Sequence, residues 1–159
     1  MRILDQIDKD ILTLLEENAK SSVIAIARQL GCPPSTVRDR IRRLEEDRVI
    51  LGYKTILNHA ELGYGINAIV QVTRERPIPI ETTVADIIEF PEVTNVRFVT
   101  GEVDELITIY ARDMEHLRDI LFTKFGTLSW SSRYNTMLIL HERSFPFMRN
   151  LNQPAEDSE

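Results

Sequence analysis

The hydrophobic positions in the first third of the chain repeat with the period of an α-helix in three successive stretches. Three sets of apolar side chains have this spacing: Leu4, Ile7, Ile11, Leu14 and Leu15; Ile26, Ala27 and Leu30; and Val37, Ile41 and Leu44. Asp5 or Asp8 would place a carboxylate near the start of the first helix, where the helix dipole favours an acid. The pattern therefore predicts three short helices around one small core.

The junction between the second and third stretches predicts a tight turn. Gly31 suits a helix end because glycine adopts the left-handed backbone conformation without a Cβ clash. Pro34 suits the first position of the next helix. Two short helices joined in this way are typical of a helix-turn-helix, whose second helix enters the major groove of double-stranded DNA.

The outward face of the third predicted helix is basic. Its solvent-facing side chains are Ser35, Thr36, Arg38, Asp39, Arg42 and Arg43. The N-terminal residues of such a helix reach base edges, and arginines contact guanine or phosphate. We therefore expect Ser35, Thr36 and Arg38 to contact bases and the two later arginines to contact phosphates. Arg40 points between the core and the exposed side, so it either contacts phosphate or pairs with an acid inside the domain. The alternative for the whole face is a solvated basic surface.

The distribution of charge supports a focused site rather than general coating of DNA. The formal net charge is −6, but residues 1–52 carry nine basic and nine acidic side chains, and residues 34–44 carry four arginines against Asp39. Local charge decides where phosphate binds, so an acidic protein can still present a positive helix.

Nothing in the composition indicates a membrane, a metal or a cofactor. No apolar run approaches the roughly 18 residues that span a bilayer, and the N-terminus is too acidic for a signal peptide, so we expect a cytoplasmic protein. The single Cys32 cannot form an internal disulfide and has no partners at zinc-ligand spacing. We expect it to be a small buried residue in the turn.

After residue 64 the pattern alternates between strand and helix. Strands are expected at residues 66–73, 93–100, 106–111 and 136–141, and helices at 79–90 and 113–125. Val84, Ile87 and Ile88 should face inward from the first helix, whereas Asp113 should cap the second. The order βαββαβ is ferredoxin-like, with both helices on one face of an antiparallel sheet. The other face also carries apolar residues, which predicts a dimer.

These patterns predict a chain of the α+β class with two domains. Residues 1–52 form the helix-turn-helix domain, residues 53–64 a linker, residues 65–150 the ferredoxin-like domain and residues 151–159 a disordered polar tail. Residues 49–57 alternate loosely and predict a strand at the boundary.

Several motifs together resemble the Lrp/AsnC, or feast/famine, family of transcription regulators. The opening LDQIDKDIL is similar to the family's L-D-x-x-D-x-x-I-L. The helix-turn-helix signature is resembled by Ser35-Thr36-Val37, Arg40-Ile41, Leu44-Glu45, Val49-Ile50 and Gly52-Tyr53, and the family's T-G-D-x-D loop by Thr100-Gly101-Glu102-Val103-Asp104. The resemblance implies a winged helix-turn-helix followed by a ferredoxin-like (RAM-type) domain. It also implies dimers that assemble into octamers, with small molecules, usually amino acids, bound between dimers at that loop.

The candidate effector residues are Thr100, Gly101, Glu102, Asp104, Glu105 and Thr136. Glycine permits close backbone approach, the carboxylates of Asp104 and Glu105 could accept an ammonium group, and the extra acid favours a cationic ligand. The threonines are possible polar partners of a ligand. The alternative is a solvated acidic hairpin beside strand-favouring threonines.

Five positions depart from the family pattern. Pro33 replaces a serine that caps the recognition helix, which removes about 1 kcal/mol of capping if no neighbour substitutes. Arg48 replaces a glycine and is strained if its φ is positive. In the effector domain Glu102 replaces an aspartate, Glu105 a bulky or aromatic residue and Tyr134 a threonine.

Two other functions stay open at this point. Some haem-pathway decarboxylases resemble this two-domain layout, although the histidines at 59, 116 and 141 are scattered and no catalytic motif accompanies them. A scaffold that binds a ligand without contacting DNA is the third possibility. Trp130 should anchor a core or an interface, and Phe145, Phe147 and Met148 should pack across a dimer seam.

Overall fold

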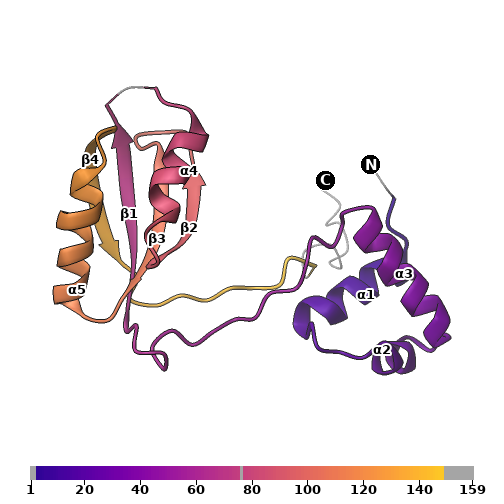
Figure 1. Cartoon of the computed structure of the whole chain (residues 1–159). Coiled ribbons are helices and arrows are strands. Elements are labelled where there is room, and N and C mark those ends of the chain that lie inside the picture. Colours follow the sequence, from indigo (N-terminus) through magenta and orange to yellow (C-terminus); the bar gives the residue numbers. More distant parts are fainter. Residues whose placement is uncertain (1–2, 76, 149–159) are drawn as a thin grey trace, which may run out of the picture. The chain divides into compact units, whose positions relative to one another are not determined.

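The computed structural model describes residues 3–75 and 77–148, which divide into two compact units (Figure 1). The helical unit contains residues up to Thr55 and the segment from Arg143 onward, and the sheet unit is Ile56–Glu142. The sequence predicted residues 143–150 in the second domain; of these, the described residues 143–148 group with the helical unit. The predicted tail at residues 151–159 lies outside the described residues.

The helical unit contains α1 (Gln6–Glu17), α2 (Val23–Leu30) and α3 (Pro34–Glu46). Asp5 and Ser22 cap α1 and α2 by accepting the amides of Asp8 and Ala25. One buried cluster joins the three helices: Ile11, Leu15, Ile26, Ala27, Val37 and Leu44. These are positions that the helical spacing predicted, and Cys32 packs against them partly buried.

The strand predicted at residues 49–57 does not form. The amides of Val49 and Ile50 donate to the Leu44 carbonyl at the end of α3, and the chain then continues without helix or strand. Leu51 is 88% exposed and Ile56 95% exposed. A strand needs a neighbour that accepts and donates its backbone hydrogen bonds, and the described chain provides none here.

The bend after α3 holds a residue other than glycine in the left-handed conformation. Arg48 has φ 55° and Gly31, at the end of α2, has φ 63°. A residue with a Cβ is about 1–2 kcal/mol less stable than glycine in the left-handed backbone conformation. Glycine loses more conformational entropy on folding, which offsets part of that difference.

We therefore expect Arg48→Gly to raise the unfolding free energy of the helical unit by roughly 0.5 kcal/mol. Gly31→Ala, at nearly the same φ, should lower it by about 1 kcal/mol. Circular dichroism at 222 nm during urea unfolding measures both changes, and shifts of the same sign would contradict the strain at Arg48.

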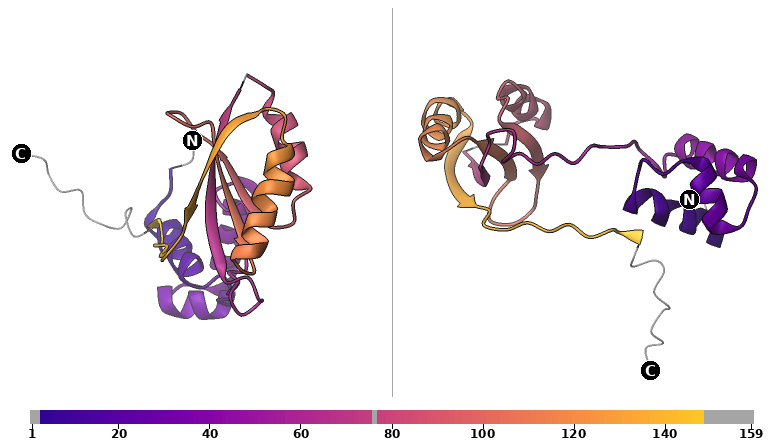
Figure 2. Two further views of the ribbon diagram at one scale, coloured as in Figure 1. Left: turned by 90° about the vertical axis from the view of Figure 1, so that its left-hand side faces the viewer. Right: turned by 90° about the horizontal axis from the view of Figure 1, so that it is seen from below.

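The sheet unit has four antiparallel strands in the order β2-β3-β1-β4. Its elements in chain order are β1 (Ile66–Arg74), α4 (Ile80–Ile88), β2 (Val93–Phe98), β3 (Glu105–Ala111), α5 (Met114–Asp119) and β4 (Ser131–Leu138). After α5 the chain continues as a π-helix (Ile120–Lys124) and a 3-10 turn (Phe125–Thr127). Figure 2 shows both helices on one side of the sheet. The ferredoxin-like order predicted from the sequence is confirmed.

Two local predictions within this unit are wrong. On α4 the buried side chains are Thr83 and Ile87, whereas Val84 is 39% and Ile88 72% exposed. The apolar residues of α4 span a wider arc than the sheet covers, so periodicity alone could not select the buried pair. Strand β4 begins at Ser131 rather than at residue 136, because its polar first half lies on the sheet edge.

Trp130 is a core anchor, one of the two roles expected for it. The side chain is 3% exposed, and its indole N–H donates to Asp86 Oδ2 at 2.8 Å. Within residues 3–75 and 77–148, no helix has the length and apolar character needed to cross a membrane.

Candidate nucleic-acid interface and effector loop

The turn between α2 and α3 has the predicted geometry. Gly31 adopts the left-handed conformation at the end of α2, and Pro34 occupies the first turn of α3. Pro33 precedes α3 without any side-chain capping bond, so neither Ser35 nor Thr36 replaces the missing cap. Helix α3 is therefore held by its buried face rather than by its first turn.

The exposed face of α3 presents most of the predicted DNA contacts together. Ser35, Arg38, Arg42 and Arg43 are exposed, and Thr36 is half-buried. Arg42 pairs with Asp39 at 3.3 Å and with Glu46 at 3.9 Å, but all three side chains are more than half exposed. Such surface pairs contribute little and can be exchanged for phosphate. Arg38 and Arg43 make no ion pair with any described residue.

Arg40 does not belong to this face. Its guanidinium donates to the carboxylates of Asp5, which caps α1, and Asp8 of α1; the bond to Asp8 is 2.9 Å long. The Asp8 side chain is 2% exposed, and the hydrogen bond from Arg40 lowers the pKa of Asp5. Of the two roles left open for Arg40, the structure shows the intradomain pair. We therefore remove it from the predicted DNA contacts.

Four predicted effector residues lie in the loop between β2 and β3: Thr100, Gly101, Glu102 and Asp104. The Val99 amide closes the loop by donating to the Asp104 carbonyl at 2.9 Å. Gly101 has φ 133°, a conformation that favours glycine. The Asp104 side chain accepts the Arg74 amide at 2.8 Å, and Glu102 is exposed. The loop therefore combines an accessible glycine backbone with two carboxylates.

Glu105 is not part of the accessible loop, contrary to the prediction. It begins β3 on the helix-facing side and is 0% exposed. Arg74 Nε and Nη2 both lie 2.5 Å from Glu105 Oε1, while Arg74 Nη1 donates to the Ile78 carbonyl and the guanidinium lies 5.4 Å from the Phe98 ring centroid. Burial raises the pKa of Glu105, against the opposing effect of Arg74. Because Arg74 already balances this carboxylate, Glu105 is withdrawn as an ammonium acceptor.

Thr136 is also separate from the loop within one chain. Thr136 lies on β4, where it pairs with Val70 of β1, and strands β1 and β3 lie between β4 and β2. The sequence predicted that Thr136 lies in a strand. It did not predict which strands are neighbours, so the separation of Thr136 from the loop could not be foreseen.

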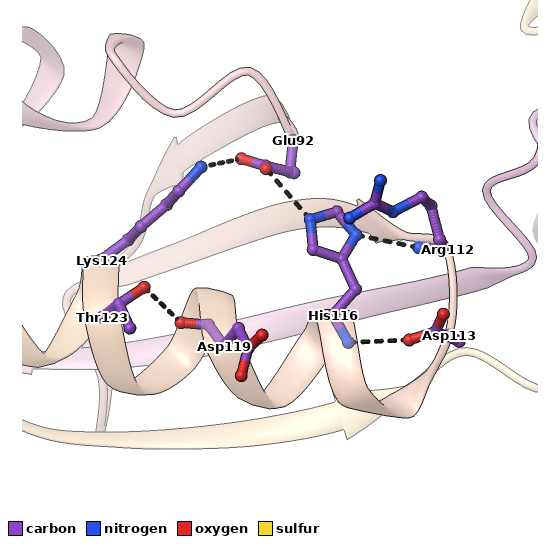
Figure 3. A network of polar contacts seen from close by, with 7 residues as sticks. All are labelled: Glu92, Arg112, Asp113, His116, Asp119, Thr123 and Lys124. Carbon is purple, nitrogen blue, oxygen red and sulfur yellow. Dashed lines mark hydrogen bonds and ion pairs between the residues drawn. The ribbon is translucent and has the colours of Figure 1, made fainter.

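A partly buried polar network beside α5 was not predicted from the sequence (Figure 3). Glu92 accepts from Lys124 Nζ at 2.6 Å and lies 3.3 Å from His116 Nε2. His116 Nδ1 accepts the Arg112 amide, so the neutral ring carries its hydrogen on Nε2, facing Glu92. The sequence predicted one neighbouring feature, the cap at Asp113, which accepts the amide of His116 at the start of α5. The network fastens the π-helix to the turn before β2.

This network predicts an acid-sensitive contribution to stability. Burial raises the pKa of Glu92, but the hydrogen bonds from Lys124 and His116 outweigh burial and lower it. A carboxylate with a lowered folded pKa stabilises the fold above its unfolded pKa and loses that contribution as the pH falls. Glu92→Gln should therefore cost about 1–2 kcal/mol at pH 7 and less at pH 4. Urea unfolding followed by Trp130 fluorescence measures this difference, and an equal cost at both pH values would contradict the assignment.

Two family models match the chain in the order of its two units. The AsnC-type helix-turn-helix domain matches residues 4–45, and the Lrp/AsnC ligand binding domain matches residues 67–145. The leucine-responsive regulatory protein of Haemophilus influenzae is 32% identical over 143 residues, which cover 89% of this chain and 86% of that protein. The HTH-type transcriptional regulator AldR of Mycolicibacterium smegmatis is 34% identical over 140 residues, or 87% and 82% of the two chains.

The fold is also that of solved regulators. A transcriptional regulator of Neisseria meningitidis, solved in complex with L-Met, superposes with a TM-score of 0.86 at 22% identity, over 94% of this chain and 98% of that one. AsnC of E. coli superposes with a TM-score of 0.81, also at 22% identity, over 91% and 97%.

A helix-turn-helix with an exposed basic helix, joined to a ferredoxin-like ligand-binding module, defines a DNA-binding transcription regulator. The chain belongs to the Lrp/AsnC family of these regulators. Its relatives are regulators rather than enzymes, which sets the decarboxylase alternative aside.

Proposed function

We propose that α3 reads a specific operator in the major groove, with Ser35, Thr36 and Arg38 at base edges and Arg42 and Arg43 at phosphates. The observation that carries the proposal is the division of the arginines on α3. Arg38, Arg42 and Arg43 share an exposed face, whereas Arg40 is committed to Asp5 and Asp8. If the helix were only a solvated basic surface, there would be no reason for one arginine to be paired and three to share an exposed face.

Selection from a random double-stranded DNA pool at two salt concentrations tests this proposal. We expect enrichment of a pseudo-palindromic site whose half-sites are about one helical turn apart, or a multiple of that spacing. Affinity should fall steeply as salt rises, because phosphate contacts release counterions. No enrichment at either salt concentration would favour the alternative of a ligand-binding scaffold without DNA contact.

We propose that two chains pair through the sheet face that the helices leave open. The strand register places Ile69, Leu106 and Met137 on this face, and Met137 is 39% exposed. Apolar side chains on an open sheet face favour a second copy as cover, and a two-fold pair would hold two recognition helices for two half-sites. Light scattering should give a dimer or a larger assembly, such as an octamer, whereas a monomer at micromolar concentration would contradict this proposal.

We propose further that the loop at residues 99–104 binds a small molecule with an ammonium group, such as an amino acid. Glu102 and Asp104 supply the negative charge, and Gly101 allows the ligand to approach the backbone. The L-Met complex of the Neisseria meningitidis regulator supports an amino acid as the ligand class. A ligand that favours one assembly would change how many half-sites are occupied together. The cytoplasm, where operator DNA and free amino acids coexist, is the proposed location.

Calorimetry with the common amino acids, tested one at a time, measures this binding. We expect heat with at least one of them, and a loss of that heat in Asp104→Asn. The absence of heat and of any change in assembly with every amino acid would remove the effector from the proposal and leave DNA reading unaffected.

A further inference from the structure

The last turn of α1 holds the C-terminal segment of the chain. Both carboxylate oxygens of Glu16 accept backbone hydrogen bonds, from the Phe147 amide at 2.6 Å and from the Met148 amide at 2.7 Å. Met148 is 6% exposed, whereas Phe145 and Phe147 are 61% and 64% exposed. The segment is therefore held through two consecutive amides and one buried methionine. The side chains of Phe145 and Phe147 remain largely exposed.

This contact changes how the two units are connected. The chain leaves the helical unit after Thr55, forms the sheet unit and returns to the helical unit from Arg143 (Figure 1). Residues 51–57 have neither helix nor strand and are exposed. This first connection alone would therefore not restrict the orientation of the helical unit. A second connection that is anchored at its end closes a loop of chain, which removes part of that freedom.

An anchor on α1 also acts on the recognition helix. Ile11 and Leu15 of α1 are buried in the same cluster as Val37 and Leu44 of α3. Arg40 adds an ion pair between α3 and Asp8 of α1. Because packed helices move as one body, a restraint on the end of α1 restrains α3.

We propose that Glu16 is a positioning residue for operator reading. By anchoring the segment at residues 143–148, it gives the helical unit a second attachment and narrows the orientations that the two recognition helices of a dimer sample. This inference rests on the proposed dimeric function. Two helices already oriented for their half-sites bind with a higher effective concentration than two freely rotating ones. The carboxylate matters because hydrogen bonds from amides to an ionised acceptor are stronger than those to a neutral one.

The test compares Glu16→Ala with Glu17→Ala in the full-length protein. Glu17 is the next residue on α1 and, like Glu16, is exposed, so its replacement makes the same change in charge. The probes are the selected operator with two half-sites and a duplex that retains one. Glu16→Ala should weaken binding to the full operator by about tenfold and to the single half-site by less than about twofold. The salt dependence should stay unchanged, because no phosphate contact is removed. Glu17→Ala should change neither affinity.

Two results would overturn the proposal. Wild-type affinity of Glu16→Ala for the full operator would show that the anchor does not orient the helices. An equal loss on both duplexes would show that the substitution damages the helical unit itself.

Hydrogen exchange at the amides of Phe147 and Met148 supplies a readout that needs no DNA. Exchange there should be at least about tenfold faster in Glu16→Ala than in the wild type, with Glu16→Gln between them because it keeps an acceptor. Equal exchange in all three would show that the anchor is absent in solution, even if operator reading is confirmed. Protected amides without any selected operator would instead contradict the proposed function, and with it the role of Glu16 in reading.

Discussion

Replacing Arg38, Arg42 and Arg43 together by alanine should weaken operator binding by about a thousandfold near 0.1 M salt. The loss has two parts. Arg38 lies at the N-terminal end of α3, where a base contact is worth about 1–3 kcal/mol and carries specificity. Arg42 and Arg43 lie further along the helix, where loss of phosphate contacts weakens binding to every sequence alike.

The salt dependence separates these two parts. Each lost phosphate contact should reduce the slope of log K against log salt by about 0.9, so a dimer that loses four contacts becomes much less salt-sensitive. Arg38→Ala alone should relax the preference at one base position and change the slope less. The variant Lys54→Ala/Arg112→Ala/Arg118→Ala removes the same charge from exposed positions outside α3. Equal losses in the two triple variants would mean that general charge, not α3, binds the operator.

The helical unit could be predicted closely from the sequence because its determinants are local. The caps at Asp5 and Ser22, the left-handed Gly31 and the helical spacing of the core each act within a few residues. The partners of Arg40 lie 32 and 35 residues away, and no local pattern distinguishes an arginine that faces two carboxylates from one that faces solvent. The return of the C-terminal segment to Glu16, across 131 residues, was equally invisible.

The sheet unit contained one signal that the prediction did not use. Residues 105–111 alternate strictly in the structure, with Glu105, Ile107, Ile109 and Ala111 all buried. A period of two puts Glu105 on the same face as Ile107 and Ile109, and a buried glutamate requires a basic partner. That partner, Arg74, ends β1, and only the strand order brings the two together. The glutamate at this position is thus one half of a buried ion pair.

This ion pair leads to the largest expected effect on the sheet unit. Arg74→Met leaves the fully buried Glu105 carboxylate without its counter-ion, and breaking a buried pair from one side costs about 3 kcal/mol. The double variant Arg74→Met/Glu105→Leu removes both charges and should recover most of this loss, because apolar residues of similar volume often replace buried pairs at little cost. Arg118→Met, at an exposed arginine on α5, is the matched control and should change stability by less than about 0.5 kcal/mol.

The pH dependence of the Arg74→Met cost identifies the unpaired carboxylate as its cause. The folded pKa of Glu105 is already raised by burial, and without Arg74 it rises further. A group with a raised folded pKa favours the folded state below its unfolded pKa, near 4.3, and loses that contribution as the pH rises through the folded pKa. The cost of Arg74→Met should therefore be larger at pH 7 than at pH 4.5. Urea unfolding followed by Trp130, the single tryptophan of the chain, measures the sheet unit at both pH values. A cost independent of pH would mean that Arg74 stabilises the unit through its contacts with Phe98 and the Ile78 carbonyl and not through Glu105.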